Sequence, residues 1–189
     1  MPQRSDDHSN AHAASDARRL RSALGMFPTG IVVVTASGAG GPLGMTINSF
    51  VSVSLQPPLI LFSIDRRSVG LAAWERAPGY AVNVLASDQQ DLSTRFARAL
   101  TDKWRDVRSR SGLHGAPLLD GALACFECTR HGTFDGGDHV VFLARVERLT
   151  YANDDAQPLV FHRGRYTSLA TGLAAQPALP PAWPLSIHY

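Results

Sequence analysis

The chain has 189 residues, a formal net charge of +2 and 18% charged residues, with Lys and Arg spread along it rather than clustered. This length suits one domain with its own buried core, and the weak scattered charge gives no reason to expect a nucleic-acid partner. The longest apolar runs, such as residues 59–62 and 140–144, are far shorter than the roughly 20 residues of a membrane-spanning helix. Residues 1–16 also lack the apolar region of a signal peptide, so we expect no membrane partner and a cytoplasmic location.

The first elements expected along the chain are a tail and a helix. Residues 1–15 are polar and show no apolar period, which predicts a disordered tail. A short helix is predicted from Asp16, its N-cap, up to Pro28. The apolar side chains on one side of this helix are Leu20, Leu24 and Phe27.

The remainder is predicted to be mainly strand. A β-branched run over 30–38 and the glycine-rich turn 38–42 predict a hairpin with a second strand over 43–48. Helices are predicted over 68–76 and 88–100, and a polar loop over 104–115. The other predicted strands cover 59–64, 80–85, 122–131, 139–150, 159–161 and 165–169, with turns at 135–138 and 153–155.

This pattern predicts a mostly β fold with flanking helices, in which turn-linked strands pair antiparallel into a barrel. The first strand is not followed by Gly-x-Gly-x-x-Gly, which disfavours a doubly wound dinucleotide-binding fold. Residues 170–189 hold several prolines and no charged side chain, and so predict an extended apolar strap. The expected organisation is therefore a tail (1–15), one domain (16–169) and a strap (170–189).

One polar segment stands out between two apolar runs. Its small uncharged hydrogen-bonding side chains are Thr46, Asn48, Ser49, Ser52 and Ser54. Such a set suits a polar ligand held by backbone groups and hydroxyls. The alternation of Val and Ser over 51–54 also fits an ordinary half-buried strand.

A second segment ends a strand with Ser63, Arg66, Arg67 and Ser68, immediately before a predicted helix. Backbone N–H groups at a helix N-terminus, together with a guanidinium, favour an oxyanion such as phosphate. The alternative is an exposed arginine pair with Ser68 as an ordinary N-cap.

A third segment is Gly137-Asp138-His139, in which Asp138 can orient the imidazole of His139 by a hydrogen bond. The alternative is a purely structural histidine at a strand start. Cys125 and Cys128 lie three residues apart on a predicted strand and point to opposite faces, which argues against a shared metal or a local disulfide. A redox pair or a zinc half-site with His131 is the less favoured reading.

No motif of a side-chain hydrolase is present, so a cofactor is expected to supply the chemistry. In order and spacing, the segments 27–35, 44–59, 65–68, 83–85, 117–128 and 137–139 resemble the flavin reductase-like family. Its members are small reductase components of two-component flavin-dependent monooxygenases with an FMN-binding split β-barrel. The resemblance spans about residues 20–169.

The resemblance implies that NADH or NADPH reduces FMN or FAD, which then leaves to serve a separate monooxygenase component, and that the chain forms a homodimer. It places a flavin against a set of residues: Thr46, Ile47, Asn48, Ser49 and Phe50 along the ring and ribityl chain, Ser52, Val53 and Ser54 in the same cleft, Ser63, Arg67 and Ser68 at the phosphate, and Phe96 closing one side. His139 meets the nicotinamide nucleotide as the catalytic residue. Because hydride transfer between stacked rings needs no general base, His139 is expected to position the nucleotide.

Two positions depart from the family pattern. Gly70 stands where a hydroxyl residue is common, and Ile47 replaces a small residue. These departures keep open a competing function, in which a biosynthetic enzyme or binding module retains its flavin without NAD(P)H turnover.

Overall fold

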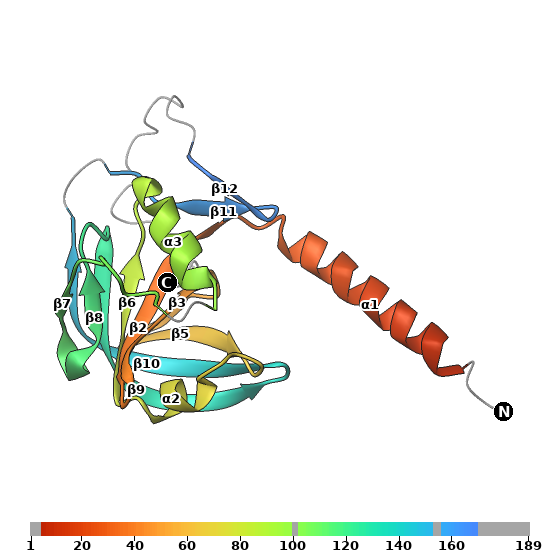
Figure 1. The fold of residues 1–189 in the computed structure, drawn as a ribbon, viewed down its shortest axis with the longest axis horizontal. Helices are drawn as coiled ribbons and strands as arrows, with labels where there is room; N and C mark the ends of the chain where they lie inside the picture. Colours follow the sequence, from red (N-terminus) through yellow and green to blue (C-terminus); the bar gives the residue numbers. More distant parts are fainter. Residues whose placement is uncertain (1–4, 100–101, 153–155, 170–189) are drawn as a thin grey trace.

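A computed structural model of the chain describes residues 5–99, 102–152 and 156–169, with side chains from residue 15 onward (Figure 1). The predicted strap 170–189 and turn 153–155 lie outside the described residues. Within them, a seven-stranded sheet has the order β3-β2-β6-β9-β10-β5-β4, and every neighbouring pair is antiparallel. The strands of this sheet are β2 (Val32–Gly38), β3 (Gly41–Ile47), β4 (Val51–Leu55), β5 (Pro58–Asp65), β6 (Gly79–Val84), β9 (Ala124–Gly136) and β10 (His139–Tyr151).

The sheet encloses one apolar cluster as a barrel. Buried side chains from β2, β5, β6, β9 and β10 meet in this cluster, and side chains of β3 pack against it. Its centre is an aromatic group in which the rings of Phe62 and Phe142 stack at 5.1 Å and Tyr80 meets both edge-on. Val32 and Val34 point into this cluster whereas Val33 packs on the outer face, as the period of two requires. The predicted antiparallel β fold is confirmed.

The outer face of the barrel is covered by smaller elements. Helix α3 (Gln90–Ala97), which follows the 3-10 turn η1 (Ser87–Gln89), packs there together with a three-stranded sheet. That sheet consists of β1 (Thr29–Gly30), β11 (Val160–His162) and β12 (Arg165–Thr167). A further ribbon of β7 (Ser109–Ser111) and β8 (Pro117–Leu119), joined by η2 (Leu113–Gly115), covers β6 and β9, so the predicted loop 104–115 is wrong in part.

Asn83 fixes this ribbon to the barrel. Its buried amide nitrogen donates to the carbonyl of Val33 at 3.0 Å, and its amide oxygen accepts from the backbone N–H of Leu119 at 2.8 Å. The amide therefore satisfies backbone groups of β2 and β8 where the two layers meet.

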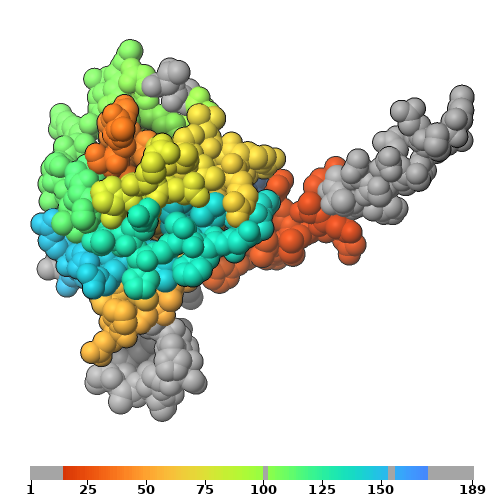
Figure 2. Space-filling view, turned by 90° about the horizontal axis from the view of Figure 1, so that it is seen from below, coloured from red at the N-terminus to blue at the C-terminus, as the bar shows by residue number. Residues whose placement is uncertain are grey.

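The two other helices begin at different residues from those predicted. α1 (Ser5–Leu24) begins eleven residues before Asp16, takes in much of the segment 1–15, and extends away from the barrel (Figures 1 and 2). Its predicted apolar side is uncovered, with Leu20 61% and Leu24 66% exposed. No helix in the described part of the chain combines the length and hydrophobicity needed to cross a membrane.

α2 (Leu71–Arg76) begins three residues later than the predicted start at Ser68. Its N-cap is Gly70, whose φ of +86° is left-handed and interrupts any helix through that position. A residue with a side chain would be strained in this conformation, so glycine suits this position.

The cysteines lie where the strand period predicts. Cys128 packs in the barrel interior and Cys125 on the outer face, and neither is paired. Burial raises the pKa of both thiols, that of Cys128 to about 12. Both therefore behave as inert core residues rather than as a redox pair.

Candidate functional site

A cleft of about 620 Å³ opens between β3, the loop that follows β5 and the end of α3. Four of the residues predicted for the site line it: Thr46, Arg67, Ser68 and Phe96. Its other lining residues are Met45, Val69, Ala97, Arg98, Ala99 and Lys103. Among the described residues, the lining combines apolar side chains with three cationic ones and contains no carboxylate, so it suits an anion attached to a flat apolar group.

The wall of the cleft is tightly packed. Phe96 is fully buried and meets Trp104 edge-on, with the ring centroids 4.9 Å apart. A Cβ at Gly44 would lie 2.4 Å from the Phe96 ring, so only glycine allows this approach. Phe96 lines this cleft as a core residue behind its surface, and its contact with a flavin stays a prediction.

Thr46 joins β3 to α3. Its hydroxyl donates to the carbonyl of Ser93 at 2.6 Å, and the Ser93 hydroxyl lies 2.9 Å from that of Tyr166 on β12. The Thr46 hydroxyl has thus already donated its proton, and it can offer a ligand only acceptor capacity.

Arg67 lies on the rim and pairs with Asp65. Its Nε and Nη2 lie 3.1 and 2.8 Å from the two carboxylate oxygens, and its backbone N–H donates to Oδ1 at 2.7 Å. These contacts hold the pKa of Asp65 well below its usual range, chiefly through the side-chain hydrogen bond, and raise the pKa of Arg67. The guanidinium keeps its remaining N–H groups for a ligand, but its position depends on Asp65.

The predicted helix start at Ser68, on which the phosphate cradle was argued, is wrong. Since α2 starts at Leu71, Ser68 is not its N-cap, and the Ser68 backbone N–H already donates to the carbonyl of Asp65 at 2.9 Å. The Ser68 backbone N–H is therefore not free for an oxyanion, whereas the Arg67 guanidinium keeps donors for one.

The remaining predicted residues lie in three places. Ile47 and Phe50 pack against the barrel interior. The Ser49 hydroxyl bridges the backbone N–H and carbonyl of Ser63, at 3.1 Å each, and so joins the β3–β4 connection to β5. The exposed residues are Asn48 and, on the edge strand β4, Ser52 and Val53, whereas the half-buried Ser54 accepts from Gln56 N–H through its hydroxyl. Their contact with a flavin stays a prediction.

His139 begins β10 directly opposite Asp65 in the strand ladder. Its Nδ1 lies 2.7 Å from Oδ1 of Asp138, so the predicted hydrogen bond is present. Asp65 is also the ion-pair partner of Arg67 on the rim of the cleft. His139 therefore lies at the same end of β5 as this rim.

Lys103 was missed from the sequence. Its ammonium donates to the carbonyls of Phe96 and Gly44 at 3.3 and 3.4 Å, and burial lowers its pKa. The neighbouring Trp104, an aromatic anchor inside a polar stretch, was the signal that this loop returns to the core.

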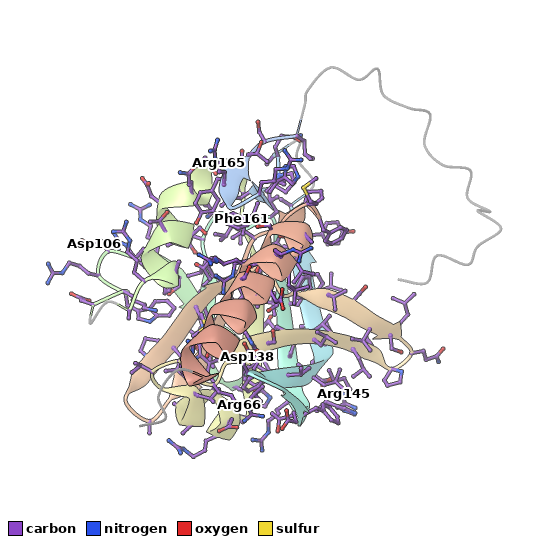
Figure 3. All side chains as sticks on the ribbon, turned by 90° about the vertical axis from the view of Figure 1, so that its right-hand side faces the viewer. Arg66, Asp106, Asp138, Arg145, Phe161 and Arg165 are labelled. Atoms are coloured by element: carbon purple, nitrogen blue, oxygen red, sulfur yellow. The ribbon has the colours of Figure 1, made fainter. Side chains whose placement is uncertain are left out.

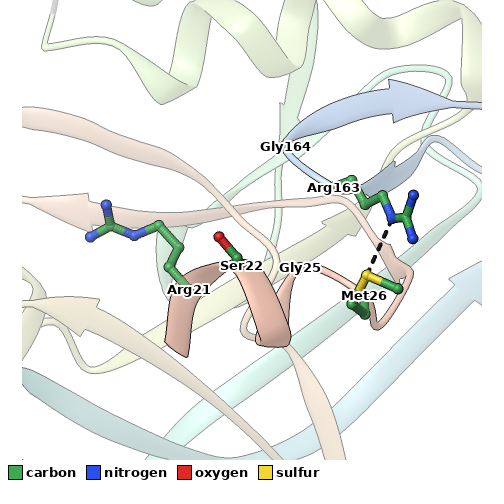
Figure 4. Close-up of a pocket in the computed structure, with 6 residues that line it drawn as sticks. All are labelled: Arg21, Ser22, Gly25, Met26, Arg163 and Gly164. Carbon is green, nitrogen blue, oxygen red and sulfur yellow. Dashed lines mark hydrogen bonds between the residues drawn. The ribbon is translucent and has the colours of Figure 1, made fainter. Parts of the chain in front are cut away.

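A second hollow of about 440 Å³ lies between the end of α1 and the β11–β12 turn (Figure 4). Its two arginines, Arg21 and Arg163, extend in opposite directions, and Arg163 Nε contacts Met26 Sδ at 3.2 Å. The hollow therefore has no convergent charge. Among the described residues, no three His, Cys, Asp or Glu side chains gather as a metal site.

The family described as flavin reductase like domain matches residues 24–170. The reductase subunit HsaB of a flavin-dependent monooxygenase from Rhodococcus jostii (strain RHA1) is 37% identical over 183 residues, 97% of this chain and 91% of that protein. The FMN reductase (NADH) SmoA of Agrobacterium fabrum (strain C58 / ATCC 33970) is 40% identical over 164 residues, 85% of this chain and 91% of that protein. The chain therefore belongs to the flavin reductase-like family.

The fold comparison agrees. The NADH:FAD oxidoreductase SgcE6 of Streptomyces globisporus C-1027, solved in complex with NAD and FAD fragments, superposes with a TM-score of 0.79 at 38% identity. The match covers 85% of this chain and 96% of that one. The predicted split β-barrel of the flavin reductase family is confirmed.

Proposed function

We propose that this chain is an NAD(P)H:flavin oxidoreductase that supplies reduced FMN or FAD to a separate flavin-dependent monooxygenase. The observation that carries the proposal is the cleft, in which a cationic rim of Arg67, Arg98 and Lys103 borders apolar walls. This donor set fits a flavin nucleotide, which joins a flat apolar ring to an anionic phosphate. The activities for which the relatives are named, HsaB and SmoA among them, support the same activity here.

The residues of the chain hold and orient the ligand. Arg67 and Lys103 supply N–H donors to a phosphate, with Ser68 beside them, while Met45 and Val69 offer apolar contact to a ring. A bound flavin supplies the capacity to accept a hydride from NAD(P)H. The protein's contribution to that step is orientation, because stacked rings within near-attack distance need no general base.

His139 serves the nicotinamide nucleotide. Since a carboxylate accepts and does not donate, the Nδ1 of His139 carries the proton shared with Asp138, and Nε2 is left to contact a ligand. His139→Ala is expected to lower turnover with NAD(P)H and leave flavin affinity nearly unchanged. An equal loss of turnover and of flavin affinity, together with a lower melting temperature, would show that the imidazole only stabilises the hairpin.

We also infer a homodimer in the cytoplasm. Exposed apolar side chains support a second copy of this chain as the partner. They are Leu20 and Leu24 on α1, Phe27 just after it, and Val51, Val53 and Leu55 on the edge strand β4. Two unpaired buried thiols support a reducing compartment. Light scattering that gives a monomer at micromolar concentration contradicts the dimer.

The activity is tested by following NADH and NADPH absorbance with purified protein and added FMN or FAD. The expected result is catalytic consumption of one nucleotide that depends on free flavin and saturates with it. A protein that keeps its flavin through gel filtration and oxidises neither nucleotide contradicts the proposal and favours a flavin-retaining enzyme or binding module.

A further inference from the structure

Arg66 connects the end of β5 to the tip of the β9–β10 hairpin. Its backbone N–H donates to the carbonyl of Asp138 at 2.9 Å, and its Nε donates to the carbonyl of Gly137 at 2.8 Å. Its Nη2 forms an ion pair with Asp135 at 3.2 Å. All three acceptors belong to one turn, and Figure 3 shows Arg66 and Asp138 side by side.

Apart from the backbone pairing of β9 with β10 and of β10 with β5, few contacts hold the tip of the hairpin. Residues 133–138 are all exposed, so no apolar burial fixes their position. Asp135 also accepts the backbone N–H of Gly137 at 2.7 Å, so the carboxylate that binds Arg66 closes the turn as well. That hydrogen bond, and next the charge of Arg66, lower the pKa of Asp135. In Figure 2 the loop after β5, in yellow, lies against the teal hairpin.

The side chains of the two neighbouring arginines therefore face different parts of the molecule. Arg67 turns to Asp65 and lines the cleft, whereas Arg66 turns to the hairpin and is not among the cleft residues. The turn that Arg66 holds is the one that carries His139. Through the carbonyls of Gly137 and Asp138, Arg66 sets the backbone from which the Asp138 carboxylate reaches Nδ1 of His139.

We propose that Arg66 is a positioning residue for the nicotinamide nucleotide, because it holds the turn that aims His139. This inference rests on the proposed function in one respect, the assignment of His139 to the NAD(P)H side. Under this proposal Arg66 affects how efficiently NAD(P)H is used, whereas Arg67 affects flavin binding, although the two residues are adjacent in the sequence.

The test compares Arg66→Ala with the wild type, using whichever of NADH or NADPH and of FMN or FAD the wild type turns over fastest. Arg66→Ala is expected to lower kcat/KM for the nucleotide about ten- to a hundredfold, the scale for a misplaced orienting group. The flavin dissociation constant should stay within about twofold. Arg66→Lys should recover part of the loss, since its ammonium can reach one of the two side-chain partners of Arg66, the Gly137 carbonyl or the Asp135 carboxylate.

Two further variants make the result specific. Arg145→Ala is the matched control, because Arg145 is likewise an ion-paired surface arginine, with Glu147 at 2.8 Å on its own strand β10. This variant should change neither kcat/KM for the nucleotide nor the flavin dissociation constant. If Arg66 acts through His139, the double variant Arg66→Ala/His139→Ala should lose no more than His139→Ala alone.

Several outcomes overturn the proposal. An unchanged kcat/KM in Arg66→Ala removes Arg66 from the reaction, and an equal loss of flavin affinity moves it to the flavin site. Additive losses in the double variant show that it does not act through His139. Should Arg66→Ala fail to fold, Asp135→Asn, which removes the ion pair and keeps an oxygen for Gly137, must lower kcat/KM in the same direction. A wild type that oxidises neither nucleotide refutes the proposed function itself.

Discussion

The interior of the barrel and the rim of the cleft are held by opposite kinds of interaction. Phe62, Tyr80 and Phe142 have no exposed surface and pack ring against ring, and burial raises the pKa of Tyr80 to about 12. At the rim, the Arg67 side chain is 86% exposed and is held by an ion pair in water. Apolar burial carries most of the free energy of folding, whereas an exposed ion pair adds little. The rim can therefore bind ligands, and change, without unfolding the barrel.

The largest effect is expected from Phe142→Ala. Removing a fully buried ring that stacks on Phe62 should lower the free energy of unfolding by about 3–5 kcal/mol. The control is Phe134→Ala, because Phe134 is 56% exposed on the neighbouring strand and should cost below about 1 kcal/mol. Denaturant unfolding of both variants checks this, and equal costs would contradict the position of the core.

Gly44→Ala tests the boundary between the two regions. The new methyl group meets the Phe96 ring at 2.4 Å, so α3 must shift away from β3, at a cost of about 1–3 kcal/mol. Flavin affinity should fall as well, because α3 forms the wall of the cleft. Gly40→Ala in the same hairpin meets nothing within 4 Å and serves as the control for both measurements. A loss of stability with unchanged flavin affinity would place the flavin elsewhere.

Arg67→Ala should change the rim alone. Losing one charge-assisted contact is expected to raise the flavin dissociation constant roughly tenfold, with a melting temperature close to that of the wild type. Fluorescence titration with FMN and a thermal melt measure the two. Unchanged flavin affinity would leave Arg67 as a solvated surface charge paired with Asp65.

The last prediction, a dependence of stability on alkaline pH, has no effect at neutral pH. The folded pKa of Cys128 rises from 9.0, and that of Tyr80 from 10.0, to about 12. The unfolded chain thus releases these protons at lower pH than the folded chain. The free energy of unfolding is therefore unaffected below about pH 9 and decreases as the pH rises toward 12. Thermal melts across this window check the sign, and Cys128→Ala should flatten the slope.

Local patterns accounted for much of the barrel. The run of β-branched residues and the glycine turn predicted the β2–β3 hairpin, whose observed ladder pairs Val32 with Ile47 and Gly38 with Gly41. The period of two also placed Cys125 and Cys128 on opposite faces. Both predictions hold because strand alternation and turn chemistry depend on residues close together in the chain.

Within the site, the sequence identified Thr46, Arg67, Ser68 and Phe96, which do meet at one cleft. It did not predict that Gly70 would delay α2 to Leu71, since a pattern of residue types carries no φ angle. Lys103 could not be found, because its ammonium acts through carbonyls of Gly44 and Phe96, one of them 59 residues away. Such contacts exist only after the chain has folded.

The sequence by itself determined the antiparallel β class, the family and the segments that carry the site, because alternation, turns and motif order are local properties. The resemblance singled out Arg67 of the two adjacent arginines, but only the tertiary structure shows what turns Arg66 away from the cleft. Arg67 pairs with Asp65, only two residues earlier in the chain, whereas the partner of Arg66, Asp135 on the β9–β10 hairpin, reaches it only because β10 pairs with β5. A side chain's direction follows from where its oppositely charged partner lies in the folded chain.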